Sequence, residues 1–179
     1  MEKIVQKINT STGETGRSFE PVTVDTTLLH ALALYVGTEG IEAAKGETTA
    51  IRYNSPHAKL FEAITRQLGP EGNYHLLRSF VDQLRWPNSH THYFMTALIF
   101  LFTSHLQDSE QEVPQQVVTV LLERLVLHRP HPWGLIVALW EVIKNANYDF
   151  FSLQFVKAAP DVRDLARSTF PKYNTVRLT

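Results

Sequence analysis

Cysteine is absent from this sequence of 179 residues. Its absence excludes disulfide bonds, thiolate zinc sites and cysteine nucleophiles together. Long hydrophobic runs are also missing: the most apolar stretch extends from Tyr93 to Phe102 and is interrupted by Thr96. A membrane-spanning helix needs about 20 apolar residues, so we expect this stretch to form a helix of the protein core. The first residues, Met1 to Thr10, lack the apolar centre of a signal peptide.

Neither sign of charge is in excess. The sequence has 17 Lys and Arg against 18 Asp and Glu, which gives a formal net charge of -1. A near-neutral chain has no global field that would hold nucleic-acid phosphates or an anionic membrane surface. The hydrophobic share of 44% and the charged share of 20% are those of a globular protein. We expect such a protein, without cysteine or signal peptide, in the cytoplasm and nucleus.

The eight histidines raise the question of a metal site. His90 and His92 are two residues apart at the start of an expected helix, where such side chains point to nearly opposite sides. His128 and His131 flank a proline bend. A zinc site needs three or four converging ligands, and the sequence has no H-E-x-x-H motif. We therefore expect no metal and no other cofactor, and assign these histidines to helix caps and corner hydrogen bonds.

Motifs of catalysis are missing as well. There is no G-x-S-x-G turn, no glycine-rich phosphate loop and no dinucleotide-binding fingerprint. Glu62, Asp82 and Glu141 lie on expected helices beside basic residues, where carboxylates commonly form ion pairs rather than act as general acids. The sequence therefore predicts a protein-interaction domain rather than an enzyme.

Apolar residues recur at helical spacing through most of the chain, and no stretch alternates as a strand would. The expected N-caps are Asp25, Ser55 before Pro56, and Asn88 or Ser89. The expected helix breaks are Gly69-Pro70, Trp86-Pro87 and the corner from Arg129 to Pro132. Val126 and Trp140 are assigned to the buried sides of their helices. These signals predict about seven or eight helices and an all-α fold.

Short corners make neighbouring helices antiparallel. We therefore expect helical hairpins stacked as an irregular HEAT-like solenoid, with a compact bundle as the alternative. Residues 1–24 are polar and broken by glycine and proline, and are expected to form a flexible arm. Residues 25–170 are expected to form the helical domain, and residues 171–179 a frayed tail.

Two corners are dense in aromatic and basic residues. The first reads R-W-P-N-S-H-T-H-Y from Arg85 to Tyr93, and the second reads R-P-H-P-W-G from Arg129 to Gly134. Arg, Trp and Tyr are enriched at binding hot spots, but Trp-Pro and His-Pro corners also lock helices together. Both interpretations stay open from the sequence. The candidate partner-binding residues are Arg85, Trp86, His92, Tyr93, Arg129, His131 and Trp133.

The same corners resemble a known family. The stretch from Arg85 to Phe94 is similar to R-[YW]-P-N-S-H-T-H-Y-F in the C-terminal domain of the large scaffold subunit (Not-one type) of the CCR-NOT deadenylase complex. The stretch from Val120 to Leu135 resembles that family's LLERL…NRPHPWGL, and Glu141 to Asn145 resembles its ELIKN. The resemblance extends in order over roughly residues 28–168. Residues 1–24 and 45–54 have no counterpart in it.

The resemblance implies a non-catalytic helical platform that docks the heterodimer of the two smaller Not-box subunits. The resemblance implies short linear motifs of RNA-binding repressor proteins as further partners. It implies no contact with a membrane and no direct contact with DNA. Through such contacts the family's complex supports mRNA deadenylation, mRNA decay, translational repression and transcription regulation. The alternative, from a different class, is direct RNA binding through scattered arginines such as Arg163 and Arg167, which share a helix face.

Overall fold

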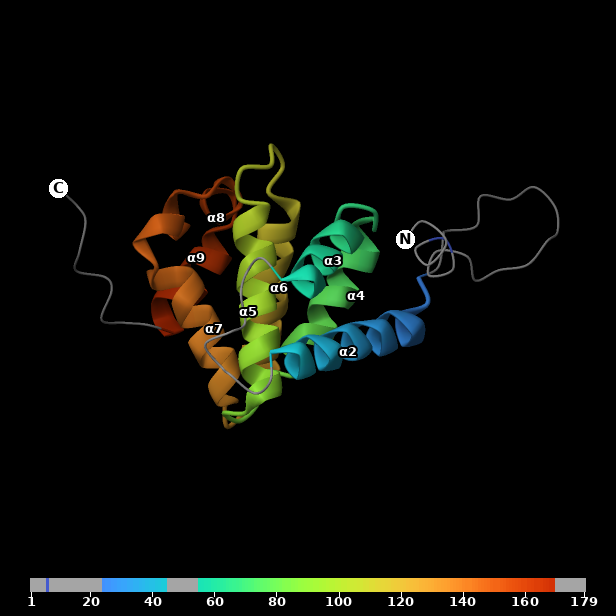
Figure 1. Cartoon of the computed structure of the whole chain (residues 1–179). Coiled ribbons are helices and arrows are strands. Elements are labelled where there is room, and N and C mark those ends of the chain that lie inside the picture. The colour runs from blue at the N-terminus through green and yellow to red at the C-terminus, as the bar shows by residue number, and fades with distance from the viewer. Residues whose placement is uncertain (1–5, 7–23, 45–54, 170–179) are drawn as a thin grey trace, which may run out of the picture.

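The structure is a computed structural model that describes Gln6 and residues 24–44 and 55–169. These residues form helices and their connections, without a strand (Figure 1). None of the helices in these ranges is long and apolar enough to cross a membrane. The helices are α2 (Thr26–Ala43), α3 (Pro56–Thr65), α4 (Pro70–Val81), α5 (Ser89–Ser104), α6 (Glu112–Leu127), α7 (Trp133–Lys144), the 3-10 helices η2 (Ala146–Tyr148) and η3 (Phe150–Ser152), α8 (Gln154–Ala158) and α9 (Pro160–Thr169).

The predicted all-α fold is confirmed by this element order. The expected tail at 171–179 lies outside the described residues, as does the expected arm at 1–24 except for Gln6 and Val24. The flexibility predicted for both segments therefore stays a prediction.

Three helices begin at the N-caps predicted from the sequence. In each case the side-chain oxygen of the cap accepts the backbone N–H of the residue three positions later. The distances are 2.9 Å at Asp25 before α2, 3.1 Å at Ser55 before α3 and 2.8 Å at Asn88 before α5. Polar residues at the corners thus fix where each helix enters the stack.

The six helices from α2 to α7 form two layers. In one layer α4 packs against both α2 and α6, and in the other α5 packs against both α3 and α7. Consecutive helices α4 to α7 also pack on one another across the layers. Figure 1 shows α5 upright in the centre, with α7 on one side and α3 and α4 on the other. This order is the predicted irregular HEAT-like solenoid rather than a compact bundle.

Aromatic side chains connect the two layers through the core. Phe61 of α3 meets Phe80 of α4 with ring centroids 4.6 Å apart, and Phe80 lies 5.3 Å from Phe94 of α5. All three side chains are fully buried. Large rings contribute most of the apolar area buried in such a core, so this row holds three helices in a fixed relation.

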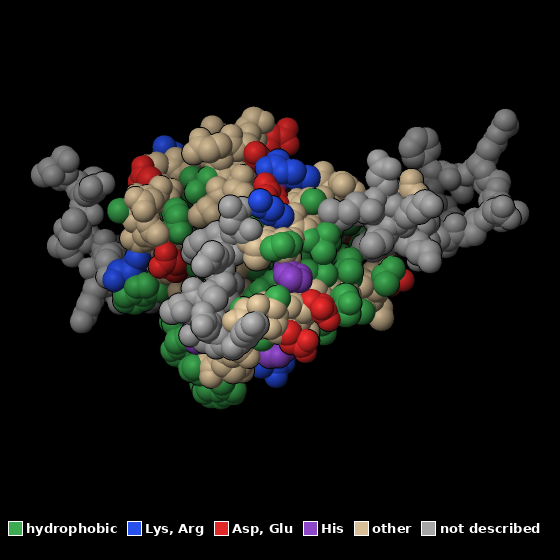
Figure 2. Space-filling view, in the orientation of Figure 1, with side chains coloured by type: hydrophobic (Ala, Val, Ile, Leu, Met, Phe, Trp, Pro, Cys, Tyr) green, Lys and Arg blue, Asp and Glu red, His purple; other side chains and the backbone are tan. Residues whose placement is uncertain are grey.

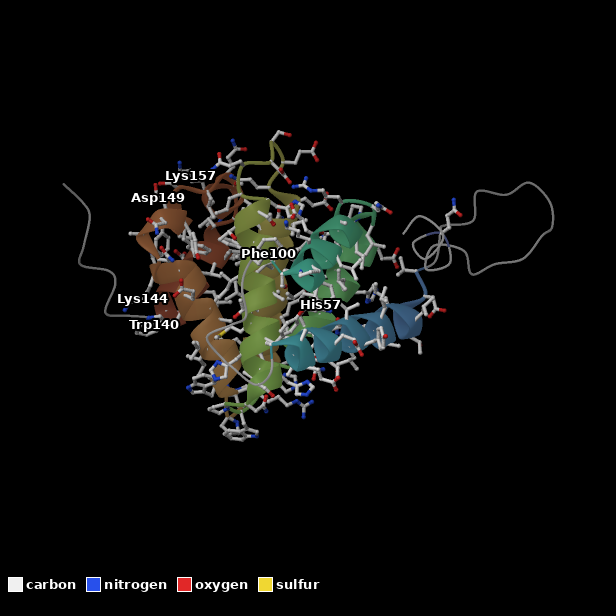
Figure 3. All side chains as sticks on the ribbon, in the orientation of Figure 1. His57, Phe100, Trp140, Lys144, Asp149 and Lys157 are labelled. Carbon is white, nitrogen blue, oxygen red and sulfur yellow. The ribbon has the colours of Figure 1, made fainter. Side chains whose placement is uncertain are left out.

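Two residues expected on buried sides are exposed, and those expectations are wrong. Val126 is 60% exposed and Trp140 is 39% exposed. Trp140 lies on the outer side of α7, where the ammonium group of Lys144 stands 4.0 Å from its ring centroid (Figure 3). This cation–π contact with a residue one helical turn away stabilises the ring at the surface without another helix packing over it. Val126 lies near the end of α6, beside a hollow that no helix fills.

The close approach of α2 to α5 gives a first prediction. A methyl group at Gly37 would lie 2.3 Å from the Phe94 ring. This ring is buried, so it cannot move away without displacing other core side chains. We expect Gly37→Ala to lower the free energy of unfolding by about 1–3 kcal/mol, the usual cost of overpacking. The better helix propensity of alanine offsets at most about 1 kcal/mol of this.

Urea unfolding followed by circular dichroism measures the change. The exposed Glu39→Ala on the same helix is the matched control and should shift stability by less than about 0.5 kcal/mol. An unchanged or stabilised Gly37→Ala protein would contradict the packing of α2 against α5.

Candidate partner-binding site

The two dense corners of the sequence meet in space. The backbone N–H of Gly134 donates to the carbonyl of Arg85 at 3.0 Å. Beside it, the rings of His92 and Trp133 make an edge-to-face contact with centroids 5.6 Å apart. The α4–α5 and α6–α7 turns form the lower tip of the molecule in Figure 1, and hydrophobic side chains gather there in Figure 2. One surface therefore unites residues that are far apart in the chain.

Thr91 fixes this junction from the inside. Its side chain is fully buried, and its hydroxyl donates to the carbonyl of Gln83 at 2.9 Å and accepts the N–H of Arg85 at 3.3 Å. A side chain at Gly134 would collide with the Thr91 methyl group at 2.5 Å. Glycine is therefore needed here for close approach, and the corner geometry is rigidly determined.

A cavity of about 310 Å³ opens beside the junction. We call it the corner pocket. Among its lining residues Leu84 and Leu135 are buried, Pro132 is half-buried, and Trp86 and Pro130 are exposed. The size lies at the lower end of the range of small-molecule pockets, roughly 300–1,000 Å³. It can take one large side chain of a partner.

The candidate residues fall into three groups by exposure. Arg85, Trp86, Arg129 and His131 are exposed; His92 and Trp133 are half-buried; Tyr93 is buried. Trp86 is 71% exposed, which is unusual for a residue of its size. The half-buried pair shapes the corner, and the exposed four form its outer surface. Partner binding by these residues stays a prediction.

Tyr93 belongs to the core rather than to the surface. Only 3% of it is exposed, and its ring packs edge-on against Phe94 with centroids 5.5 Å apart. Its hydroxyl lies against Gly40 of α2 and has no hydrogen-bond partner among the described residues. Burial raises the pKa of Tyr93 to about 12, because the phenolate form would lose its hydration.

Sequence reasoning missed the charged wall of the corner pocket. Arg124 of α6 forms an ion pair with Asp82, which follows α4, and both line the cavity with His128. These residues are separated by long stretches of ordinary helix, so nothing local in the sequence joins them to the corners. Their ion pair fixes the C-terminal part of α6 beside the pocket.

A second cluster places a carboxylate, an imidazole and a hydroxyl in a row, as in a hydrolytic triad, but the hydroxyl is not arranged as a nucleophile. Nδ1 of His105 lies 2.6 Å from a carboxylate oxygen of Asp108, and Nε2 lies 3.3 Å from the hydroxyl of Thr65. That hydroxyl donates to the carbonyl of Glu62 at 2.8 Å, and Thr65 is 3% exposed. All three side chains line a cavity of about 360 Å³, but the Thr65 hydroxyl donates to a backbone carbonyl rather than to His105, so the cluster joins α3 to the end of α5. No described group of three or more His, Asp or Glu residues could hold a metal ion.

Three of the scattered arginines, Arg66, Arg163 and Arg167, have partners within the protein. Arg66 pairs with Glu62 at 3.0 Å, and Arg163 lies 3.7 Å from Asp164. The guanidinium group of Arg167 stands 5.6 Å from the ring of Phe151. Cations paired in this way add little to a field that would attract phosphates.

The sequence matches, over residues 1–169, the family described as CCR4-Not complex component, Not1. The chain belongs to the Not1 family. The match includes 1–24 and 45–54, for which the resemblance read from the motifs had no counterpart. It also confirms the family suggested by the two corners.

Relatives of known name agree with this assignment. The chain is 40% identical over 146 residues to the CCR4-NOT transcription complex subunit let-711 of Caenorhabditis elegans, covering 79% of this chain and 5% of that protein. It is 30% identical over 151 residues to the general negative regulator of transcription subunit 1 of Saccharomyces cerevisiae, covering 83% of this chain and 7% of that protein. The chain thus spans a small part of the length of these Not1 relatives.

Solved structures show the same fold. The NOT1 superfamily homology domain from Chaetomium thermophilum superimposes with a TM-score of 0.80 at 32% identity, over 94% of this chain and 33% of that one. A Not1 C-terminal domain, solved in complex with Not4, gives 0.70 at 26% identity over 89% of this chain and 33% of that one. The fold is that of a Not1 C-terminal-type domain.

The buried hydroxyl of Tyr93 gives a second prediction. The pKa rises from 10.0 in the unfolded chain to about 12 in the folded one, so the folded state holds this proton more tightly. The contribution of this hydroxyl to the free energy of unfolding is fully present below pH 10. It falls as the pH rises toward 12, by up to about 1.4 kcal/mol per pH unit. Tyr93→Phe should remove this alkaline loss.

Near neutral pH the same variant should be as stable as the parent or more stable by about 1 kcal/mol, because it removes an unpaired buried hydroxyl. Urea unfolding at pH 7 and across the alkaline range measures both effects. Tyr35→Phe, at a 64% exposed tyrosine, is the control and should leave the pH dependence unchanged. A clear loss of stability in Tyr93→Phe at pH 7 would mean that the hydroxyl has a partner.

Proposed function

We propose that this chain is a protein-binding scaffold domain of a CCR4-Not complex and docks the heterodimer of the two smaller Not-box subunits. It contributes no catalysis of its own. By holding partners together it supports mRNA deadenylation, mRNA decay, translational repression and transcription regulation, in the cytoplasm and nucleus. Short linear motifs of RNA-binding repressors are further partners in this proposal.

One observation carries the proposal: a Not1 C-terminal domain with this fold was solved in complex with another protein, Not4. That complex supports protein binding as the role of the fold, and the two smaller Not-box subunits are the finer part of the proposal. The chemistry of the described residues agrees with protein binding. Exposed aromatic side chains beside apolar pockets are characteristic of protein interfaces.

We place one contact at the corner pocket. Trp86 stands 71% exposed at the mouth of a pocket, beside a junction held by backbone and side-chain hydrogen bonds. A rigid support means that little conformational entropy is lost when a partner binds. An aromatic residue presented in this way has the properties of a hot spot.

Isothermal titration calorimetry of the chain with the purified Not-box heterodimer tests the proposal. We expect saturable binding, and we expect Trp86→Ala to weaken it at least about tenfold. The melting temperature should stay within about 1 °C, because the ring is mostly in solvent. Absence of binding by the folded chain would contradict the proposal.

Two variants sharpen the test. Tyr35→Ala removes an exposed aromatic side chain of α2, outside the corner pocket, and should leave the affinity unchanged. Trp133→Ala removes the half-buried ring that contacts His92 and should lower stability as well as affinity. Equal effects of Trp86→Ala and Tyr35→Ala would rule out the corner pocket as the binding site.

A further inference from the structure

A second hollow lies on a different face of α6 and is larger than the corner pocket. Its volume is about 480 Å³. We call it the α6–α9 groove, because α6 and α9 supply most of its walls. Leu122 forms part of its buried floor, Val126 and Leu127 stand on one wall, and Val162 and Leu165 stand on the other. The lining is therefore mainly apolar.

The groove is open because α9 does not close against α6. The main packing partner of α9 is α8, which leaves a gap along the end of α6. Val126 is 60% exposed and Leu127 is 71% exposed at this gap. Single exposed apolar residues are common, but two adjacent ones beside a hollow lined with further apolar groups form a patch of the kind used for binding.

The edge of the groove carries negative charge on both sides. Glu123 lies on the α6 side and Asp161 on the α9 side, and none of the described residues that line the cavity is a Lys or Arg. Neither carboxylate forms an ion pair with another described residue. Glu123 accepts the hydroxyl of Tyr74 at 2.7 Å, which holds it at the edge and raises the pKa of Tyr74. A partner that fits this edge is positively charged.

The spacing of the wall indicates the shape of the occupant. The α6 residues that line the groove are Thr119, Leu122, Glu123, Val126 and Leu127. From Thr119 to Val126 they extend over about 10 Å at 1.5 Å per residue, or two turns of helix. A face of this length between two helices matches a short amphipathic helix, whose apolar residues recur three and four positions apart.

We propose that the α6–α9 groove docks a short amphipathic helix of a partner protein that has two or three large apolar side chains on one face, flanked by Lys or Arg. The apolar face lies on Leu122, Val126 and Leu127, and the basic residues lie near Glu123 and Asp161. This inference rests on the proposed scaffold function, and it adds a second surface with a partner chemistry of its own.

A display library of random 16-residue segments, panned on the full chain, tests the groove with no partner sequence chosen in advance. The Leu127→Glu chain serves for counter-selection; its altered side chain is exposed, and circular dichroism verifies its fold. We expect recovered segments to be basic, with large apolar residues at i, i+3 or i+4, and i+7. Fluorescence anisotropy then gives the affinity of synthetic versions.

The variants give distinct expectations. Val126→Glu should weaken binding at least about tenfold, as at a buried apolar contact. Glu123→Gln keeps an acceptor for Tyr74 and removes the charge, so it should weaken binding severalfold and reduce its dependence on salt. Tyr35→Ala, at an exposed residue of α2 that does not line the groove, should leave the affinity for these segments unchanged.

Three results would overturn the inference. The first is that the library yields no segments enriched on the parent chain over the Leu127→Glu chain. The second is that the recovered segments are acidic or lack helical spacing of their apolar residues. The third is that the chain sediments as a dimer and that Leu127→Glu abolishes this dimer. The last would assign the groove to a second copy. The titration with the heterodimer tests the corner pocket. If the chain does not bind the heterodimer, the proposed function is contradicted, and the library experiment still decides whether the α6–α9 groove binds a helix.

Discussion

The close contact between the backbones of the two corners is the constraint on which the candidate binding surface depends. A carbonyl that follows α4 accepts the N–H of Gly134 at the start of α7, and this approach is possible only because position 134 has no side chain. Thr91 fills the space behind the contact with its methyl group and satisfies the nearby backbone with its hydroxyl. The exposed aromatic and basic groups outside are then held on a junction with little freedom. A binding residue on such a support loses less entropy than one on a free loop.

Much of the fold could be predicted because its signals are local. The N-caps at Asp25, Ser55 and Asn88 follow from side-chain chemistry within one helical turn. The errors arose where burial depends on distant elements. Val126 has the spacing of an inward residue, but its cover would have to come from α9, which packs mainly on α8. Trp140 has an apolar pattern around it, but lies on an outer side where Lys144 is its neighbour.

The candidate site was predictable in part, for the same reason. Composition identified two dense corners, but their contact across α4 to α7 is a property of the stack and cannot be seen in either corner alone. The Arg124–Asp82 pair and the α6–α9 groove were missed because their members come from separate helices with ordinary sequences. The burial of Tyr93 follows from its spacing: it precedes Ala97 and Leu101 by four and eight positions, and both are buried. Here helical spacing was a better guide than residue type.

The two-layer order of the helices has a consequence for how the chain reaches this structure. Most packing joins helices that are one or two places apart along the chain, so each new contact closes only a short loop. A stack built from near neighbours can grow from α4, α5 and α6 toward both ends without a long search. The corner junction brings together the turns that flank α5 and α6, and it can form only after these two helices have packed on one another. The candidate binding surface thus depends on the central helices alone, and a change that keeps α5 from packing on α6 would remove it without touching any of its residues.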